Sequence, residues 1–381
     1  MPGFELIGQE EKDLVNKIFE NGGILMRYGF DHLRNNVYMV NKFEKRFANT
    51  LGSKYALAVT SGTAALKVGL KALGIGPGDE VITQSHTFIA TVEAILECGA
   101  TPVMTEINET LNMCPEDLKK RITPKTKAII PVHMLGVSCQ MNEIIEIANM
   151  NHIPVLEDTA QAVGGKYNGK CLGTIGQIGC YSFDFGKALT TGEGGMVVSD
   201  NEHIYQKAIE YHDHGHENNP NLPRGEDSRS IAGFNYRMME IQGAIGLAQL
   251  GKLNGSLEKQ KQSKHILKQA LSECENIRFR HIPDKKGDTC DTLVFFLDTI
   301  DRAKNVAHEL KKQGIGTKNL PDAINWHFSG TWDHIFDNAN DFWKHSETIL
   351  RKSIALPIFI NMDSHQIELM ADKTLSVLKK I

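Results

Sequence analysis

The sequence predicts an α/β fold with a large, mostly parallel sheet of seven strands, followed by a smaller α+β carboxyl-terminal part. Two observations carry this prediction. Between residues 56 and 199, short and continuous apolar runs alternate with amphipathic segments, a pattern typical of parallel strands covered by helices on both faces. After residue 255 the alternation stops and strands mix with helices, as expected for a separate α+β unit.

The amino-terminal segment precedes the sheet. Residues 8–22 and 38–50 show apolar positions at helical spacing, which predicts two helices. The intervening stretch MRYGFDHLRNN is polar, aromatic and cationic without a clear period. Its arginines Arg27 and Arg34, together with Arg237, are candidates for binding an anionic substrate group, and each suits a surface or interface position equally well.

The expected elements of the sheet follow in chain order. The seven apolar runs predicted as strands are 56–60, 80–83, 101–105, 128–132, 154–157, 179–183 and 195–199. Helices are predicted at 64–73, 90–97, 142–149 and 234–271. Beyond them, the runs predicted as strands are 277–283, 292–298 and 353–359, mixed with two helices. We therefore expect a large unit at 1–254 and a small carboxyl-terminal domain at 255–381.

Length, charge and cysteine content exclude several protein classes. The chain has 381 residues and a net charge of −4, so it lacks the basic excess that nucleic-acid binding requires. Seven dispersed cysteines without CxxC pairs indicate reduced thiols. The amino terminus does not resemble a signal peptide, and no apolar run approaches the roughly 20 residues that span a bilayer. These features predict a cytoplasmic protein with neither nucleic acid nor membrane as partner.

Ligands of such sheets bind at the carboxyl ends of strands. At two predicted strand ends the residues suit binding of a phosphate group and of a planar ring. The turn TSGTAA, which contains Gly62 and Thr63, enters a helix. A helix amino terminus attracts an anion such as phosphate, although an ordinary helix cap has the same appearance. Phe88 follows the next strand and suits stacking on a planar ligand, although a core phenylalanine is the commoner case.

Two further strand ends carry ionisable residues. Asp158 ends a buried run in LEDTAQ, where a carboxylate requires a cation or hydrogen bonds, and helix capping is the alternative. Lys187 lies in the turn SFDFGKALTTGEGG, directly after an apolar run, rather than on the solvated face usual for lysine. Pyridoxal 5′-phosphate requires a phosphate cup, a stacking ring, a carboxylate and a lysine together. Burial of the lysine would lower its pKa and make the amine more nucleophilic.

The same motifs carry a family resemblance. The stretches SGTAAL, QSHTFIAT, EDTAQAVGG, SFDFGKALTTGEGGM and GFNYRMMEIQGAIGLAQL resemble those of the DegT/DnrJ/EryC1/StrS sugar aminotransferases. The resemblance implies the fold type I architecture of PLP-dependent aminotransferases and an obligate homodimer with shared active sites. The catalytic residues that it implies are Lys187, bonded to the cofactor, and Asp158, at the pyridine nitrogen. The other cofactor-binding residues that it implies are Gln161 at the 3′-oxygen, Phe88 on the ring, and Gly62, Thr63, Ser182 and the partner subunit's Asn235 at the phosphate.

The resemblance also bears on the reaction and its substrates. Sugar 3-dehydratases of this family carry histidine at the position of Lys187, so the lysine implies transamination, with L-glutamate as donor. The segments MPGFELIG, HDHGH and NWHF look closest to the branch that aminates C8 of an 8-oxo-3-deoxy-octulosonate. This sugar acid is therefore the expected acceptor. The alternative is a nucleotide-linked 4-keto-6-deoxy sugar for surface polysaccharide, such as lipopolysaccharide, biosynthesis.

Other interpretations stay open at this point. A desulfurase or aldolase of the same fold, or a non-catalytic regulator, would share many of these motifs. The apolar neighbours of Cys180 suggest burial, which does not suit a desulfurase nucleophile. The alternating His212, His214 and His216 would suit zinc on a strand, but a loop is favoured and no metal is expected. Residues 325–328 either line the cleft or pack between domains.

Overall fold

The computed structural model describes residues 3–219, 221–223 and 225–381, so Met1 and Pro2 of the MPGFELIG motif lie outside the described residues. The strands of the large sheet are β1 (Tyr55–Val59), β2 (Glu80–Gln84), β3 (Thr101–Thr105), β4 (Thr126–Ile130), β5 (Leu156–Asp158), β8 (Ile178–Ser182) and β9 (Gly195–Ser199). Every run predicted for this large sheet is therefore a strand, with its ends within two residues of the predicted ones.

These strands form one continuous surface. Four are hydrogen-bonded in the order β1-β9-β8-β5 and three in the order β3-β2-β4. Parallel bridges from Ile129 to Val155 and from Val132 to Asp158 join β4 to β5. Among these strands β9 runs antiparallel to both of its neighbours, and the pairs β2–β3, β2–β4 and β5–β8 are parallel. The prediction of a mostly parallel sheet of seven strands is confirmed.

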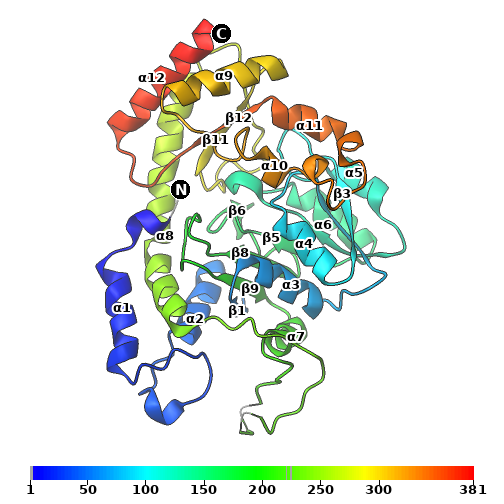
Figure 1. Ribbon diagram of the computed structural model, residues 1–381, viewed down its shortest axis with the longest axis vertical. Helices are drawn as coiled ribbons and strands as arrows, with labels where there is room; N and C mark the ends of the chain where they lie inside the picture. The colour runs from blue at the N-terminus through cyan, green and yellow to red at the C-terminus, as the bar shows by residue number, and fades with distance from the viewer. Residues whose placement is uncertain (1–2, 220, 224) are drawn as a thin grey trace.

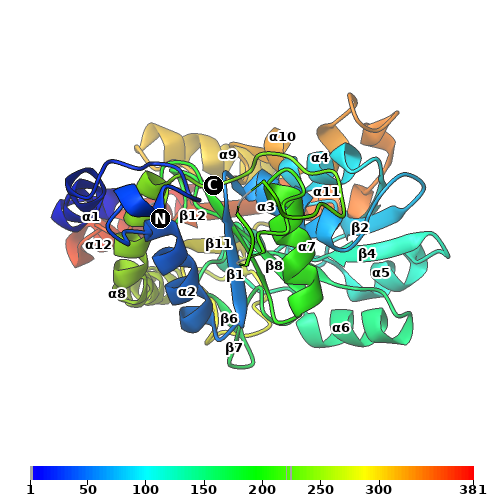
Figure 2. The ribbon, with the colours of Figure 1, turned by 90° about the horizontal axis from the view of Figure 1, so that it is seen from below.

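Helices cover both faces of this sheet. They are α1 (Gln9–Glu20), α2 (Met39–Leu51), α3 (Gly62–Ala72), α4 (Ala90–Glu97), α5 (Pro115–Arg121), α6 (Met141–Met150), α7 (Glu202–His212) and α8 (Glu240–Leu271). Figure 2 shows α2 and α8 on one side of β1 and β8, and α3 and α7 on the other. Side chains alternate between the faces of a strand, so Leu57 and Val59 join the core under α3 and α7. Ala56 and Ala58 join the core under α2 and α8.

The carboxyl-terminal part contains a smaller antiparallel sheet. Its strands, in the order β10-β11-β12, are β10 (Arg278–Phe279), β11 (Thr292–Phe296) and β12 (Ser353–Pro357). Its helices are α9 (Ile300–Lys312), α10 (Ile324–His327), α11 (Lys344–Arg351) and α12 (Ser364–Lys380). The sequence predicted two helices here, and the structure has four. The helices α10 and α11 are too short to show a helical period in the sequence. A hairpin of β6 (Lys166–Tyr167) and β7 (Lys170–Cys171) lies beside the large sheet.

Helix α8 joins the two parts without interruption. It runs from the neighbourhood of α2 to that of α12 along the long axis of the molecule (Figure 1). Its last residues, such as Leu267 and Leu271, belong to an apolar core shared with β11, β12, α9 and α12. The expected boundary between residues 254 and 255 falls inside this helix, and the division into two domains stays a prediction.

Candidate active site

One cavity of about 450 Å³ lies at the carboxyl ends of the sheet strands. Every residue predicted to be catalytic or to bind the cofactor, except Asn235, lines it. These residues are Gly62, Thr63, Phe88, Asp158, Gln161, Ser182 and Lys187. The carboxyl-terminal part closes the cavity with Thr289, Asp291, Lys318, Asn319 and His327. Residues that are far apart in the sequence thus meet at the edge of the sheet where ligands of α/β proteins bind.

Helix α3 begins at the wall of this cavity. The Oγ of Ser61 accepts a hydrogen bond from the Ala64 N–H at 3.0 Å and so caps the helix. The backbone N–H groups of Gly62 and Thr63 donate a hydrogen bond to no group in the described residues. A Cβ on Gly62 would lie 2.5 Å from the Cβ of Ser182, so glycine allows the helix to start against β8. Two free N–H groups at the positive end of the helix form a cup for an anion such as phosphate.

Asp158 ends β5 with 4% of its surface exposed. Its Oδ2 accepts from Thr91 Oγ1 at 2.8 Å, and its Oδ1 accepts from the Ala160 N–H at 3.1 Å. Burial raises the pKa of Asp158, whereas these hydrogen bonds and the charge of Lys187 lower it. A buried carboxylate of this kind is stabilised by a cation placed beside it.

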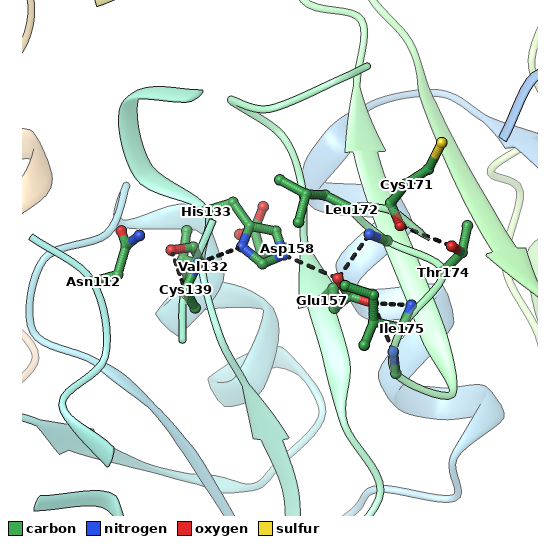
Figure 3. A network of polar contacts seen from close by, with 12 residues as sticks. Asn112, Val132, His133, Cys139, Glu157, Asp158, Cys171, Leu172, Thr174 and Ile175 are labelled. Atoms are coloured by element: carbon green, nitrogen blue, oxygen red, sulfur yellow. Dashed lines mark hydrogen bonds and ion pairs between the residues drawn. The ribbon is translucent and has the colours of Figure 1, made fainter. Parts of the chain in front are cut away.

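A buried network lies next to Asp158 and holds this edge of the sheet (Figure 3). Glu157 is fully buried, and its Oε1 accepts from the N–H groups of Ile175 and Gly176, both at 2.7 Å. Its Oε2 accepts from the Gly173 N–H at 2.8 Å and from His133 Nε2 at 3.0 Å. The network ties β5 to the loop before β8, and it fixes the backbone from which Asp158 projects.

Lys187 lies half-buried in the turn after β8. Its N–H donates to the Asp184 carbonyl at 2.9 Å, and its carbonyl accepts from the Gly3 N–H at 2.7 Å. Its Nζ forms no hydrogen bond or ion pair with the described part of the chain. Burial lowers the pKa of Lys187, and the nearby charge of Lys318 lowers it further. A lysine in this state is unprotonated more often than a solvated one, so its amine is more readily available as a nucleophile.

Gln161 and Phe88 both line the cavity. The Oε1 of Gln161 accepts from the Leu135 N–H at 3.1 Å, which leaves its Nε2 as a donor for a ligand. Phe88 is 42% exposed, so it is not a core phenylalanine. Its ring centroid lies 5.4 Å from that of His327, and the Thr87 N–H donates to the His327 carbonyl at 3.1 Å. Within the 325–328 segment His327 lines the cavity, whereas Phe328 packs in an apolar core with Leu135 and Val294.

Several cavity residues carry no sequence signal of their function. Thr91, in α4, donates a hydrogen bond to Asp158. In the sequence it is a single threonine within an apolar helical pattern, which gives no sign of this contact. Asp291 and Lys318 form a buried ion pair with Nζ and Oδ2 2.7 Å apart, and they lie in stretches that read as an ordinary strand and loop. Only the spatial neighbourhood of the two side chains identifies them.

The three candidate arginines are all held by carboxylates and do not line the cavity. Arg27 forms a bidentate ion pair with Glu44, in which Nη1 lies 2.6 Å from Oε1 and Nη2 lies 2.8 Å from Oε2. Arg34 pairs with Glu240 at 2.8 Å, and both side chains are buried. Arg237 pairs with Asp213. The expectation that the segment around Arg27 and Arg34 serves a substrate anion therefore loses its structural support, because these charges are already neutralised.

The three alternating histidines have separate surroundings. His212 is the last residue of α7 and its ring contacts Tyr28. His214 is exposed, and His216 pairs with Asp227 at 2.9 Å. In the described ranges, no three side chains of His, Cys, Asp or Glu are arranged to hold a metal ion.

Asn235 and Cys180 also differ in their surroundings. Asn235 is exposed and lies away from the cavity of its own chain, so its expected role at the partner's phosphate stays a prediction. Cys180 is 1% exposed, and burial raises the pKa of its thiol. A buried, protonated thiol is a poor nucleophile, which disfavours a desulfurase.

Across the described ranges, no helix is both long and apolar enough to cross a bilayer.

Comparison with known proteins decides the family. Residues 9–374 match the DegT/DnrJ/EryC1/StrS aminotransferase family. The chain belongs to this family. It is 38% identical over 264 residues to a GDP-perosamine synthase of Escherichia coli O157:H7, covering 69% of each chain. It is 44% identical over 217 residues to the GDP-perosamine synthase of Caulobacter vibrioides, covering 57% of each.

A solved structure supports the fold and the cofactor. NtdA of Bacillus subtilis, determined with bound pyridoxamine phosphate (PMP), superimposes with a TM-score of 0.85 at 27% identity, over 99% of this chain and 84% of that one. The protein is thus a DegT-family, PLP-dependent sugar aminotransferase of fold type I, as the sequence predicted. The finer assignment to the octulosonate branch is not shown.

The cavity of this DegT-family enzyme fits PLP. The unpaired N–H groups of Gly62 and Thr63 suit the phosphate. The buried carboxylate of Asp158, which makes no ion pair in the described chain, suits the pyridine nitrogen. The free amine of Lys187 suits covalent attachment.

The residues around the cofactor divide the chemistry among them. PLP, when bound, supplies an electron sink that stabilises negative charge on the carbon undergoing proton transfer. Asp158 would keep a proton on the pyridine nitrogen of the bound cofactor by charge compensation. Lys187 would remove the proton from the α-carbon of the donor as a general base and would deliver it to the cofactor as a general acid.

Proposed function

We propose that this enzyme transfers the amino group of L-glutamate to the keto group of a nucleotide-linked 4-keto-6-deoxy sugar, in surface polysaccharide biosynthesis. The observation that carries the transfer is the unpaired Lys187 amine in the same cavity as the buried Asp158 carboxylate. The nucleotide-linked acceptor is supported by the relatives at 38% and 44% identity, whose names state a sugar attached to GDP.

This acceptor replaces the octulosonate that the sequence motifs favoured. Arg27 and Arg34 were candidates for an anionic group of the substrate, which is a carboxylate in the sugar acid and a diphosphate in the nucleotide-linked sugar. Both guanidinium groups are bound to glutamates of the same chain, and releasing them would leave buried carboxylates unpaired, at a cost of about 3–5 kcal/mol each. The occupied arginines therefore favour neither acceptor, and the choice rests on the relatives whose names state a GDP-linked sugar.

We further propose a cytoplasmic homodimer with shared active sites and a small domain at 255–381. Asn235 is exposed and the phosphate cup is open to contacts from outside the chain, which supports its contribution to the partner's cup. The apolar core shared by the end of α8, β11, β12, α9 and α12 supports a separate folding unit.

The test mixes the PMP form of the enzyme with each acceptor in the absence of amino donor. Return of the visible absorbance of the PLP form is followed in time. We expect fast return with a GDP-linked 4-keto-6-deoxyhexose. Fast return with the 8-oxo-octulosonate alone would reverse the choice of acceptor and leave the family assignment intact.

A further inference from the structure

Lys318 is a charged side chain of the cavity wall to which the chemistry described above gives no task. Lys187 and Lys318 are the lysines among the described residues that line the cavity, and no described arginine lines it. His327 also lines it, but burial lowers the pKa of that imidazole to about 4, so it is neutral near pH 7. Lys318 is therefore the cation available to a substrate once Lys187 is engaged in proton transfer.

The surroundings of Lys318 hold its ammonium group in a fixed position. Its side chain is 11% exposed and that of Asp291 is 4% exposed. The Nζ donates to Asp291 Oδ2 at 2.7 Å, while Asp291 Oδ1 accepts from Thr292 Oγ1 at 2.9 Å. Burial lowers the pKa of Lys318, and the carboxylate of Asp291 opposes this effect. Asp291 therefore favours the charged form of the ammonium and occupies one of its three N–H groups, leaving the other two for a ligand.

Two further polar groups of the same wall lack strong partners. The Oγ1 of Thr289 is buried and has no hydrogen-bond partner in the described chain. The Nδ2 of Asn319 reaches only Gln161 Oε1, at 3.5 Å, which is long for a hydrogen bond. Both residues line the cavity. A buried hydroxyl and a loosely held amide beside an ammonium group form a set of donors for a carboxylate.

We propose that Lys318 binds a carboxylate of the amino donor, with Asp291 as its positioning residue. This inference rests on the proposed function, which names an amino acid as donor. The donor's α-carboxylate is attached to the carbon from which Lys187 removes a proton, so it must enter the cavity with that carbon. The diphosphate of a nucleotide-linked acceptor lies several bonds from the reacting keto carbon and can stay outside.

The arrangement has a consequence for Lys187. The charge of Lys318 is one of the causes that lower the pKa of Lys187. A bound carboxylate neutralises that charge, so Lys187 becomes a stronger base when the donor is in place. Donor binding and proton abstraction are then coupled through the pair of lysines.

The test measures binding without reaction. Glutarate carries two carboxylates but no amine, and its affinity for the holoenzyme is measured by titration calorimetry near neutral pH. Replacing Lys318→Gln should weaken glutarate binding by about tenfold or more, the loss expected for a charge-assisted hydrogen bond. Lys318→Arg should retain most of the affinity. The matched control is Lys264→Gln, because Lys264 forms an equally buried pair with Asp288 that does not line the cavity, and glutarate affinity should not change.

A double variant keeps the test decisive if the single one folds poorly. Lys318→Gln leaves Asp291 buried without its cation, whereas Lys318→Gln with Asp291→Asn removes both charges. The double variant should lose glutarate binding and slow the half-reaction with L-glutamate. Wild-type affinity for glutarate in either folded variant would overturn the proposal.

The acceptor half-reaction separates the two sources of an anionic group. The PMP form of each variant is mixed with the nucleotide-linked sugar, and its rate should fall much less than the rate of the half-reaction with L-glutamate. A loss confined to this half-reaction would assign Lys318 to the acceptor and overturn the proposal. Wild-type enzyme that reacts with L-glutamate but not with the nucleotide-linked sugar would overturn the proposed acceptor alone, and Lys318 would keep its role.

Discussion

Replacing Glu157→Gln tests the buried network next to Asp158. Each carboxylate oxygen of Glu157 accepts two hydrogen bonds: Oε1 from Ile175 and Gly176, Oε2 from Gly173 and His133. A glutamine presents one oxygen and one NH₂ group, so in either orientation of the amide two buried donors face another donor. Each unsatisfied buried donor costs about 1–3 kcal/mol. We therefore expect the free energy of unfolding to fall by roughly 2–6 kcal/mol.

The assay is urea-induced unfolding of the holoenzyme, followed by far-ultraviolet circular dichroism. Glu97→Gln is the control, because Glu97 is 70% exposed and its ion pair with Lys67, at 3.0 Å, lies on the surface. Such a pair contributes about 1 kcal/mol or less. If Glu157→Gln were no more destabilising than Glu97→Gln, the four hydrogen bonds would not hold this edge of the sheet, and the reasoning would be wrong.

Three further predictions concern the site and the assembly. Lys187→Ala should abolish turnover and the visible band of the covalently attached cofactor, and a variant with normal turnover would contradict the role of this lysine. Mixing Lys187→Ala with Asn235→Ala protomers should restore activity, because one site of a heterodimer with shared sites is intact; inactive, verified heterodimers would argue against shared sites. For His327, burial lowers the pKa to about 4 from an unfolded value of about 6.5, so the unfolded chain binds its proton first. Its contribution to stability is fully present above pH 6.5 and is lost, by about 3 kcal/mol, as the pH falls to about 4; a His327→Gln variant should show a smaller loss over this range in urea titrations.

Much of the fold and most of the candidate site follow from local sequence patterns. The strand–helix alternation predicts the large sheet, because continuous apolar runs reflect strands buried on both faces. The strand ends then carry Gly62, Asp158 and Lys187 to one edge of that sheet, where the structure brings them to one cavity. The shortest helices of the carboxyl-terminal part escaped prediction because a few residues show no period.

The sequence by itself thus determined the fold class, the family and the residues that suit the cofactor. Only the tertiary structure decided which charges remain for a substrate. Arg27 and Arg34 look available in the sequence, yet Glu44 and Glu240 neutralise them from other helices. Lys318 looks unremarkable in its loop, yet the fold buries it in the cavity wall more than a hundred residues from Lys187 in the chain. The physical reason is that local patterns report burial and periodicity, whereas an ion pair depends on which distant segments the packed core brings into contact.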